Sequence, residues 1–212
     1  MKSKKSTKLM PTSSNTYILE ADKCIFKTIE VEKDSTYYLF DLNDQKTSAN
    51  LTFNVKSGVN LTFYILSVNN ALTHNFKFKF NQEPISKLSM FAKCFASKKA
   101  IITLDGDIIV GKNTTSVVAD QEINGFVFSD TASISTTPAL IIDTNNVKAS
   151  HAVNIARIEP SKIFYLETKG MDKAQAINML IMNEISFLND IKKIKGYENT
   201  IDVVYNKIKQ ML

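Results

Sequence analysis

The chain has 212 residues, of which 44% are hydrophobic, and its formal net charge is +5 at pH 7. This length and composition agree with a compact protein that buries one sizeable core, either as one domain or as a β domain with a helical appendage. The positive charge does not indicate nucleic-acid binding, because the basic residues are scattered lysines with Arg157 as the sole arginine, and paired contacts to guanine or phosphate depend mainly on arginine.

The first 15 residues predict a flexible basic tail. They combine a lysine-rich start with a polar stretch from Pro11 to Asn15, without the apolar region of a signal peptide. No apolar run in the sequence is long enough to cross a bilayer. We therefore expect no membrane insertion and a cytoplasmic location.

Residues 16–158 predict a series of short β-strands. Apolar and polar residues alternate over many segments, most regularly from Phe76 to Phe80, and helical periodicity is absent. A short repeat is visible, since the sequence of residues 50–53 recurs at residues 60–63. The near-even spacing favours a β-solenoid, in which each turn buries its apolar face against the next turn. A β-sandwich would give much the same pattern.

The cysteines and the first histidine of this region offer little chemistry. Cys24 and Cys94 lie far apart and match no zinc or redox spacing, so we expect no disulfide framework. Cys94 alternates with apolar neighbours, as a buried cysteine does; its other interpretation is a sulfur acceptor or cluster ligand inside the solenoid. His74 heads an alternating strand with no partner nearby in the sequence, so we expect it at the surface.

Residues 138–170 form the junction between the β region and a helical region. An alternating strand is followed by a polar turn at residues 143–146. His151 comes next, at or just after a strand edge, where a neutral imidazole can bind iron or carry a proton. Pro160 suits the first turn of a helix and Gly170 its end.

A set of residues in this junction carries a resemblance to a known protein family. They are Pro138, Leu140, Ile142, Val147, Ser150, His151, Ile158, Phe164, Tyr165, Leu166 and Gly170. In this order and spacing they resemble the C-terminal motif of the SufB/SufD family, the scaffold components of SUF iron–sulfur cluster assembly, and SufD more than SufB. The resemblance implies a right-handed parallel β-helix followed by a C-terminal helical segment that docks a SufC-like ABC ATPase. On this ground we favour the solenoid over the sandwich.

The resemblance also implies how the site would be built. SufB and SufD are similar in pairing through their β-helices, which implies a homodimer, or a heterodimer with a SufB-like subunit. His151 is then the candidate metal-binding and cluster-binding residue, near the dimer interface. Any iron–sulfur cluster would be transient and shared with the partner subunit.

Two features depart from the SufD pattern. Ala149 and Ala152 stand where SufD-like members commonly have a cysteine and a glycine, so the thiolate that iron–sulfur clusters prefer is missing beside the histidine. The chain is also shorter than usual members, and we expect it to be without their N-terminal helical region. A degenerate β-solenoid interaction module without cluster chemistry is therefore the alternative to a scaffold subunit.

Nothing in the sequence indicates an enzyme. It contains no phosphate-binding loop, so any ATP dependence must come from a partner, and no catalytic triad or paired carboxylates. A metal-dependent enzyme of cupin-like β architecture is disfavoured, because the two histidines are accompanied by no clustered ligands.

Residues 159–212 predict a C-terminal helical segment. Asp172 and Gln175 fit a capping box, and apolar residues at three- and four-residue steps predict one helix that ends at Gly196, followed by a last helix. Most of this apolar stripe is expected to serve the core. The alternative keeps some apolar side chains exposed as a docking surface for the ATPase, drawn from Met179, Ile181, Met182, Ile185 and Phe187.

Overall fold

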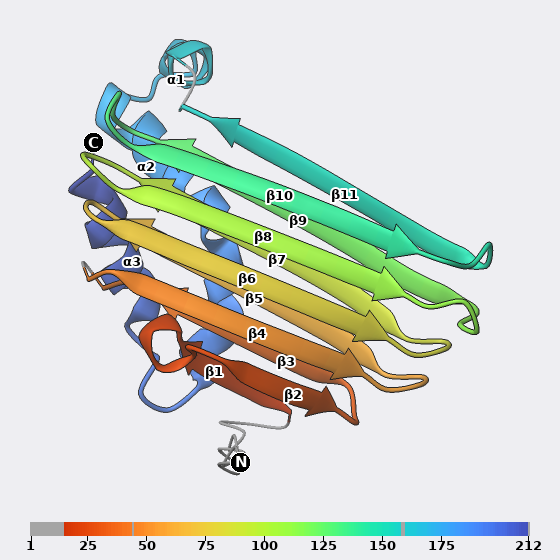
Figure 1. The fold of residues 1–212 in the computed structure, drawn as a ribbon. Helices are drawn as coiled ribbons and strands as arrows, with labels where there is room; N and C mark the ends of the chain where they lie inside the picture. Colours follow the sequence, from red (N-terminus) through yellow and green to blue (C-terminus); the bar gives the residue numbers. More distant parts are fainter. Residues whose placement is uncertain (1–14, 44, 158–159, 212) are drawn as a thin grey trace.

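The computed structural model describes residues 15–43, 45–157 and 160–211, in which two parallel β-sheets face one another (Figure 1). Successive strands alternate between the sheets, so that each pair of strands completes one turn of a solenoid of about five turns. One sheet, called here the helix-covered sheet, contains in spatial order β1 (Thr16–Glu20), β3 (Ser35–Asp41), β5 (Asn60–Asn69), β7 (Lys87–Ala96), β9 (Val117–Val127) and β11 (Val147–Ala156). The other, the open sheet, contains β10 (Ser133–Ile142), β8 (Ile101–Val110), β6 (Thr73–Gln82), β4 (Thr47–Val55) and β2 (Lys27–Val31).

The pairing of the strands decides between the two predicted architectures. All the strand pairs that the structure describes are parallel, and residues of like kind stack in register, as Phe53 of β4 does on Phe80 of β6. A β-sandwich is built from antiparallel strands joined by hairpins. The predicted parallel β-solenoid is therefore confirmed, and the sandwich interpretation is wrong.

The solenoid interior is an aromatic and aliphatic core. Because side chains of a strand point alternately to its two faces, the alternation at Phe76, Phe78 and Phe80 places all three rings inside. The ring of Phe53 lies 4.9 Å from that of Phe63 across the interior and 5.3 Å from that of Phe80 along the open sheet. Each turn thus buries its apolar face against the next turn.

Helices form a third layer on the outer face of the helix-covered sheet (Figure 1). They are α2 (Lys173–Glu184), the 3-10 helix η2 (Ser186–Lys193) and α3 (Thr200–Lys209). The helix α1 (Pro160–Thr168) precedes them, contacts α2 and has no buried residue, and a further short 3-10 helix, η1 (Ala21–Lys23), follows β1. The apolar stripe of these C-terminal helices packs on Tyr38, Leu66 and Phe95, whose side chains point outward from the sheet. The capping box is confirmed, because the backbone N–H of Gln175 donates to Oδ1 of Asp172 at 2.8 Å and the N–H of Asp172 donates back at 2.9 Å.

The predicted single helix up to Gly196 is wrong, since α2 ends at Glu184 and a 3-10 helix follows. The next apolar residues, at positions 185, 188, 191 and 194, are spaced by three. A 3-10 helix has three residues per turn and keeps such residues on one face, whereas an α-helix rotates them steadily away. All four are buried against the sheet. The 3-10 helix is thus the conformation that places all four of these side chains against the sheet.

The change from strands to helices falls between Ala156 and Pro160. The boundary that we predicted at residues 158 and 159 lies outside the described residues, as do residues 1–14 of the predicted basic tail. Among the helices that the structure describes, none combines the length and the apolar content needed to cross a bilayer.

Candidate functional site

The last turn of the solenoid, made of β10 and β11, leaves the core uncovered. The outer edges of these two strands pair with no other described strand. Val153 and Ile155 of β11 remain 43% and 38% exposed, although Ile123 of β9, the register partner of Val153, is fully buried. In the first turn, by contrast, Leu19 is buried. Unpaired edges beside exposed apolar side chains are a ready template for another strand.

His151 lies in this last turn. It is in the middle of β11, in register with Gln121 of β9, whereas the sequence indicated a position at or just after the edge of a strand. Gln121 points into the solenoid, where its amide approaches Gly106 of the opposite sheet, so His151 occupies the interior-facing row as well. Since no further turn of the described part of the chain covers it, its imidazole is exposed at the open end.

The donors around His151 are too few to hold a metal cluster alone. Ala149 and Ala152 add none, and the hydroxyl of Ser150, on the other face of β11, donates to Oδ1 of Asp120 at 2.7 Å. Within the part of the chain that the structure describes, no group of three or more histidine, cysteine, aspartate or glutamate side chains could hold a metal ion. An iron–sulfur cluster at His151 would therefore need most of its ligands from a second chain.

Cys94 is buried inside the solenoid on β7. Burial, with a smaller contribution from the charge of Asp41, raises the pKa of its thiol to about 12. The thiolate is the form that accepts sulfur or binds metal. This environment favours the interpretation as a buried small hydrophobe. Cys24 is also a buried free thiol whose pKa is raised, again by burial first.

His74, which we expected at the surface, is fully buried, and that prediction is wrong. Its Nδ1 lies 3.0 Å from Oδ2 of Asp41, and its Nε2 lies 2.9 Å from the carbonyl oxygen of Ala71. Ser67 donates to the same Oδ2 at 2.8 Å, and Asn69 donates to it as well. Burial alone would lower the pKa of His74, but the hydrogen bond and charge of Asp41 raise it above its ordinary value.

This buried polar cluster could not be found by local sequence reading. Its members are separated by 26 residues or more from Asp41 and meet only through the solenoid register, in which Asp41 pairs with Ser67. The available signal was a polar residue recurring at an interior position of successive turns. Because the cluster has no solvent access, its role is to hold the turns together.

Only part of the predicted docking surface is accessible. Met179 and Met182 are exposed, but Ile181 and Ile185 are buried against the helix-covered sheet, and Phe187 stacks on Tyr64 with 5.2 Å between ring centres. Of the five, only Ile181 and Ile185 belong to the apolar stripe of this segment, and the sheet buries both. Met179 and Met182 lie off the stripe and remain exposed to solvent.

Exposed apolar side chains are also present on α1, which the sequence did not single out for docking. Phe164 and Tyr165 are 67% and 60% exposed, and α1 has no buried residue. Between α1 and α2 lies a groove of about 270 Å³ whose lining includes Tyr165, Leu166 and Leu180. We call Phe164, Tyr165, Met179 and Met182 the α1/α2 patch.

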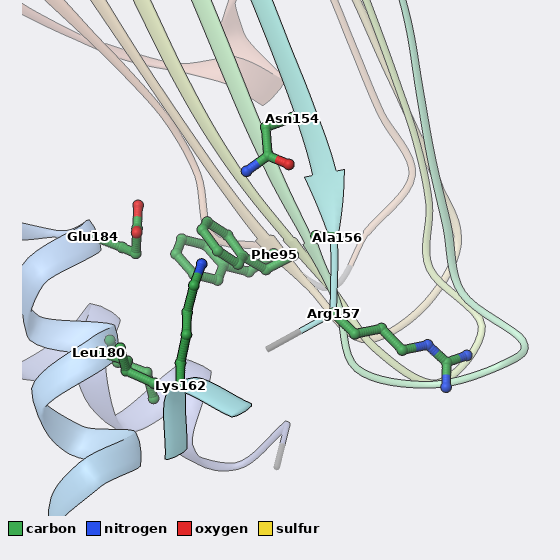
Figure 2. Close-up of a pocket in the computed structure, with 9 residues that line it drawn as sticks. Phe95, Asn154, Ala156, Arg157, Lys162, Leu180 and Glu184 are labelled. Carbon is green, nitrogen blue, oxygen red and sulfur yellow. The ribbon is translucent and has the colours of Figure 1, made fainter. Parts of the chain in front are cut away.

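A small cavity lies where the end of β11 meets α1 and α2 (Figure 2). Phe95 and Phe126, stacked at 5.0 Å, form its apolar side, and Lys162 and Glu184 stand at its polar side. Glu184 also accepts a hydrogen bond from Lys93 at 2.8 Å. The cavity volume of about 60 Å³ has room for a few water molecules, which is too little for a substrate or cofactor.

Comparisons with known proteins point to one family. The family model described as "SUF system FeS cluster assembly, SufBD core domain" matches residues 21–183. An iron–sulfur cluster assembly SufBD family protein of Synechocystis sp. is 31% identical over 98 residues, which are 46% of this chain and 22% of that protein. The iron–sulfur cluster assembly protein SufD of Bacillus subtilis is 28% identical over 43% of this chain and 21% of its own length. The SufD of Escherichia coli is 26% identical over 51% of this chain and 26% of its own length, so the chain matches only about a quarter or less of each relative.

Proposed function

The chain belongs to the SufBD core-domain family of the SUF system, and on that premise we propose that it is a non-catalytic, SufD-like scaffold subunit of iron–sulfur cluster assembly. The observation that carries the proposal is the family match over residues 21–183, because it includes both the open last turn and the start of the helical layer. The proposed scaffold has three working parts: a pairing edge, a cluster-binding imidazole and a docking surface.

The open last turn supports pairing with a second subunit. Strand edges of β10 and β11 and the exposed side chains of Ile142, Val153 and Ile155 offer backbone pairing and apolar burial at the same place. A second copy of this chain or a SufB-like subunit would cover them. Either arrangement brings His151 to the contact between the two subunits.

The iron–sulfur cluster is the substrate of this scaffold. His151 would supply one borderline nitrogen ligand, and the partner subunit would supply thiolates, since Ala149 and Ala152 cannot. A cluster held by one histidine from this chain is easily released, which suits a transient assembly site.

The α1/α2 patch supports docking of a SufC-like ABC ATPase. Two aromatic rings and two methionines provide large, adaptable apolar contacts that the protein does not use for its own core. The partner would then hydrolyse the ATP that drives assembly, in keeping with the absence of a phosphate-binding loop motif from this sequence.

The test is anaerobic purification of the chain co-expressed with a SufB-like and a SufC-like protein. We expect a brown complex that contains iron and acid-labile sulfide. His151→Ala should lower the cluster yield without changing the melting temperature, because this side chain is exposed, and Ser150→Ala on the opposite face of β11 is the matched control. A large stability loss with normal cluster yield would assign His151 a structural role.

Docking needs point variants, because the segment after Gly170 buries part of the outer sheet face and its deletion would expose that core. Met179→Glu with Met182→Glu should abolish co-purification of the ATPase while the fold persists. Val203→Glu, a similar change at an exposed apolar residue of α3, is the control. Normal ATPase binding by the double variant would contradict the docking site.

The second candidate function is a solenoid interaction module that has lost cluster chemistry. The alanines at positions 149 and 152 favour it. A complex that forms normally but is colourless and contains no iron would identify this function.

A further inference from the structure

Gln121 is a buried polar residue directly beside the candidate ligand. It lies on β9 in register with His151 of β11, so the two are consecutive in one interior-facing row. Adjacent strands are about 4.8 Å apart. The side chain of Gln121 is almost completely buried, whereas His151 next to it is exposed. A buried amide therefore lies beneath the imidazole.

Gly106 makes room for this amide. The Nε2 atom of Gln121 crosses the interior and lies 3.4 Å from the carbonyl oxygen of Gly106 and 3.4 Å from Sδ of Met90. A Cβ atom at position 106 would lie 2.2 Å from Nε2, which is closer than any real contact. Glycine within a strand weakens the strand, so its presence in β8 is explained by the approach of Gln121.

The other amide atom, Oε1, is buried without a hydrogen-bond partner in the structure as described. The neighbours of Gln121 in the register are Met90 below it and His151 above it, and its amide meets the backbone of Gly106 in the opposite sheet. Of the side chains of Met90 and His151, only the imidazole carries a polar hydrogen. It is the one neighbour whose side chain can satisfy Oε1.

We propose that Gln121 is a positioning residue for His151, with Oε1 accepting a ring N–H when the imidazole turns inward. A neutral imidazole that donates from one nitrogen presents the lone pair of the other nitrogen, so this bond fixes which nitrogen faces the open end. The inference rests on the proposed function in one respect, namely that the presented nitrogen binds iron. The hydrogen bond itself does not depend on a cluster.

The test is ¹⁵N NMR of histidine-labelled full-length protein, above the pH at which histidine is charged. The chain has two histidines, and buried His74 serves as an internal reference. Gln121→Met should change the ratio of the two neutral tautomers of His151 by about two- to tenfold, the factor that one net hydrogen bond supplies. Gln121→Glu keeps an acceptor oxygen and should restore the original ratio.

Gln82→Met is the matched control. Gln82 is also buried on an interior face with an unpartnered Oε1, but it lies at the end of β6, in register with Val55 and Val110. This variant should leave the His151 tautomers unchanged. Gly106→Ala keeps Gln121 but takes the space of its amide, and it should shift the ratio as Gln121→Met does.

The outcomes separate this inference from the proposed function. An unchanged tautomer ratio in folded Gln121→Met or Gly106→Ala protein overturns the positioning role. A changed ratio with a normal cluster yield in His151→Ala supports the hydrogen bond and refutes the cluster ligand. If Gln121 positions His151 and His151 also binds the cluster, Gln121→Met should weaken iron binding by the assembled complex about tenfold. This is the usual effect of removing a hydrogen-bond partner of a metal ligand.

Discussion

The pair of Asp41 and His74 gives the sharpest stability prediction. Both side chains are almost completely buried, with 3.0 Å between Nδ1 and Oδ2. His74→Phe keeps an aromatic ring in place but leaves the Asp41 carboxylate with only its Ser67 and Asn69 donors. Removing one partner of a buried ion pair costs about 3–5 kcal/mol. Because two donors stay, we expect the free energy of unfolding at pH 6 to fall by about 3 kcal/mol.

The pH dependence of this loss identifies its cause. In the folded state Asp41 raises the pKa of His74, against the opposing effects of burial and of the charge on Lys207. A histidine with a raised folded pKa stabilises the fold fully below its unfolded pKa of about 6.5, and that contribution is lost as pH rises through the folded value. The gap between wild type and variant should therefore be widest below about pH 6 and narrow as pH rises through the raised folded pKa of His74.

Urea denaturation at several pH values, followed by circular dichroism and tyrosine fluorescence, measures this gap; the sequence has seven tyrosines and no tryptophan. Lys56→Met, which breaks the exposed pair of Lys56 and Glu83, is the control and should change stability very little. A gap for His74→Phe that stays constant or widens as pH rises would rule out the Asp41–His74 pair as the cause of the loss.

Three further experiments test local features of the fold. Ile85 has a φ of 63° and an exposed side chain, so Ile85→Asn should raise the free energy of unfolding by about 1 kcal/mol, since left-handed backbone suits asparagine; a loss in urea titration would contradict this. Asp172→Ala removes the capping box of α2 and should cost about 1 kcal/mol, measured as a lower melting temperature, whereas Asp172→Asn should cost less. Cys94 should resist alkylation by iodoacetamide in the native protein and react once urea unfolds it; fast native labelling would mean that the thiol is accessible.

Features set by nearby residues could be predicted from the sequence. The alternation from Phe76 to Phe80 predicted a strand that buries every second ring, and β6 does so. The capping box at Asp172 and Gln175 was likewise readable, because its two hydrogen bonds join residues three apart. The stretch from Pro138 to Gly170 also carried the family resemblance that the family model confirms.

Features set by distant residues could not be predicted in this way. His74 was placed at the surface because its partner Asp41 precedes it by more than 30 residues. The pairing offset also varies along the solenoid, since Ser35 pairs with Leu61 but Lys87 pairs with Val118. No fixed period in the sequence therefore reveals which side chains stack on one another.

The sequence by itself determined the strands, the helical tail and the family, because each depends on periodicity or spacing within a short stretch of chain. Only the tertiary structure decided that His151 shares a row with Gln121, that Ile181 and Ile185 face the sheet, and that Asp41 meets His74. The physical reason is that loops of unequal length join the strands, and burial of the apolar interior sets the register that brings these side chains together.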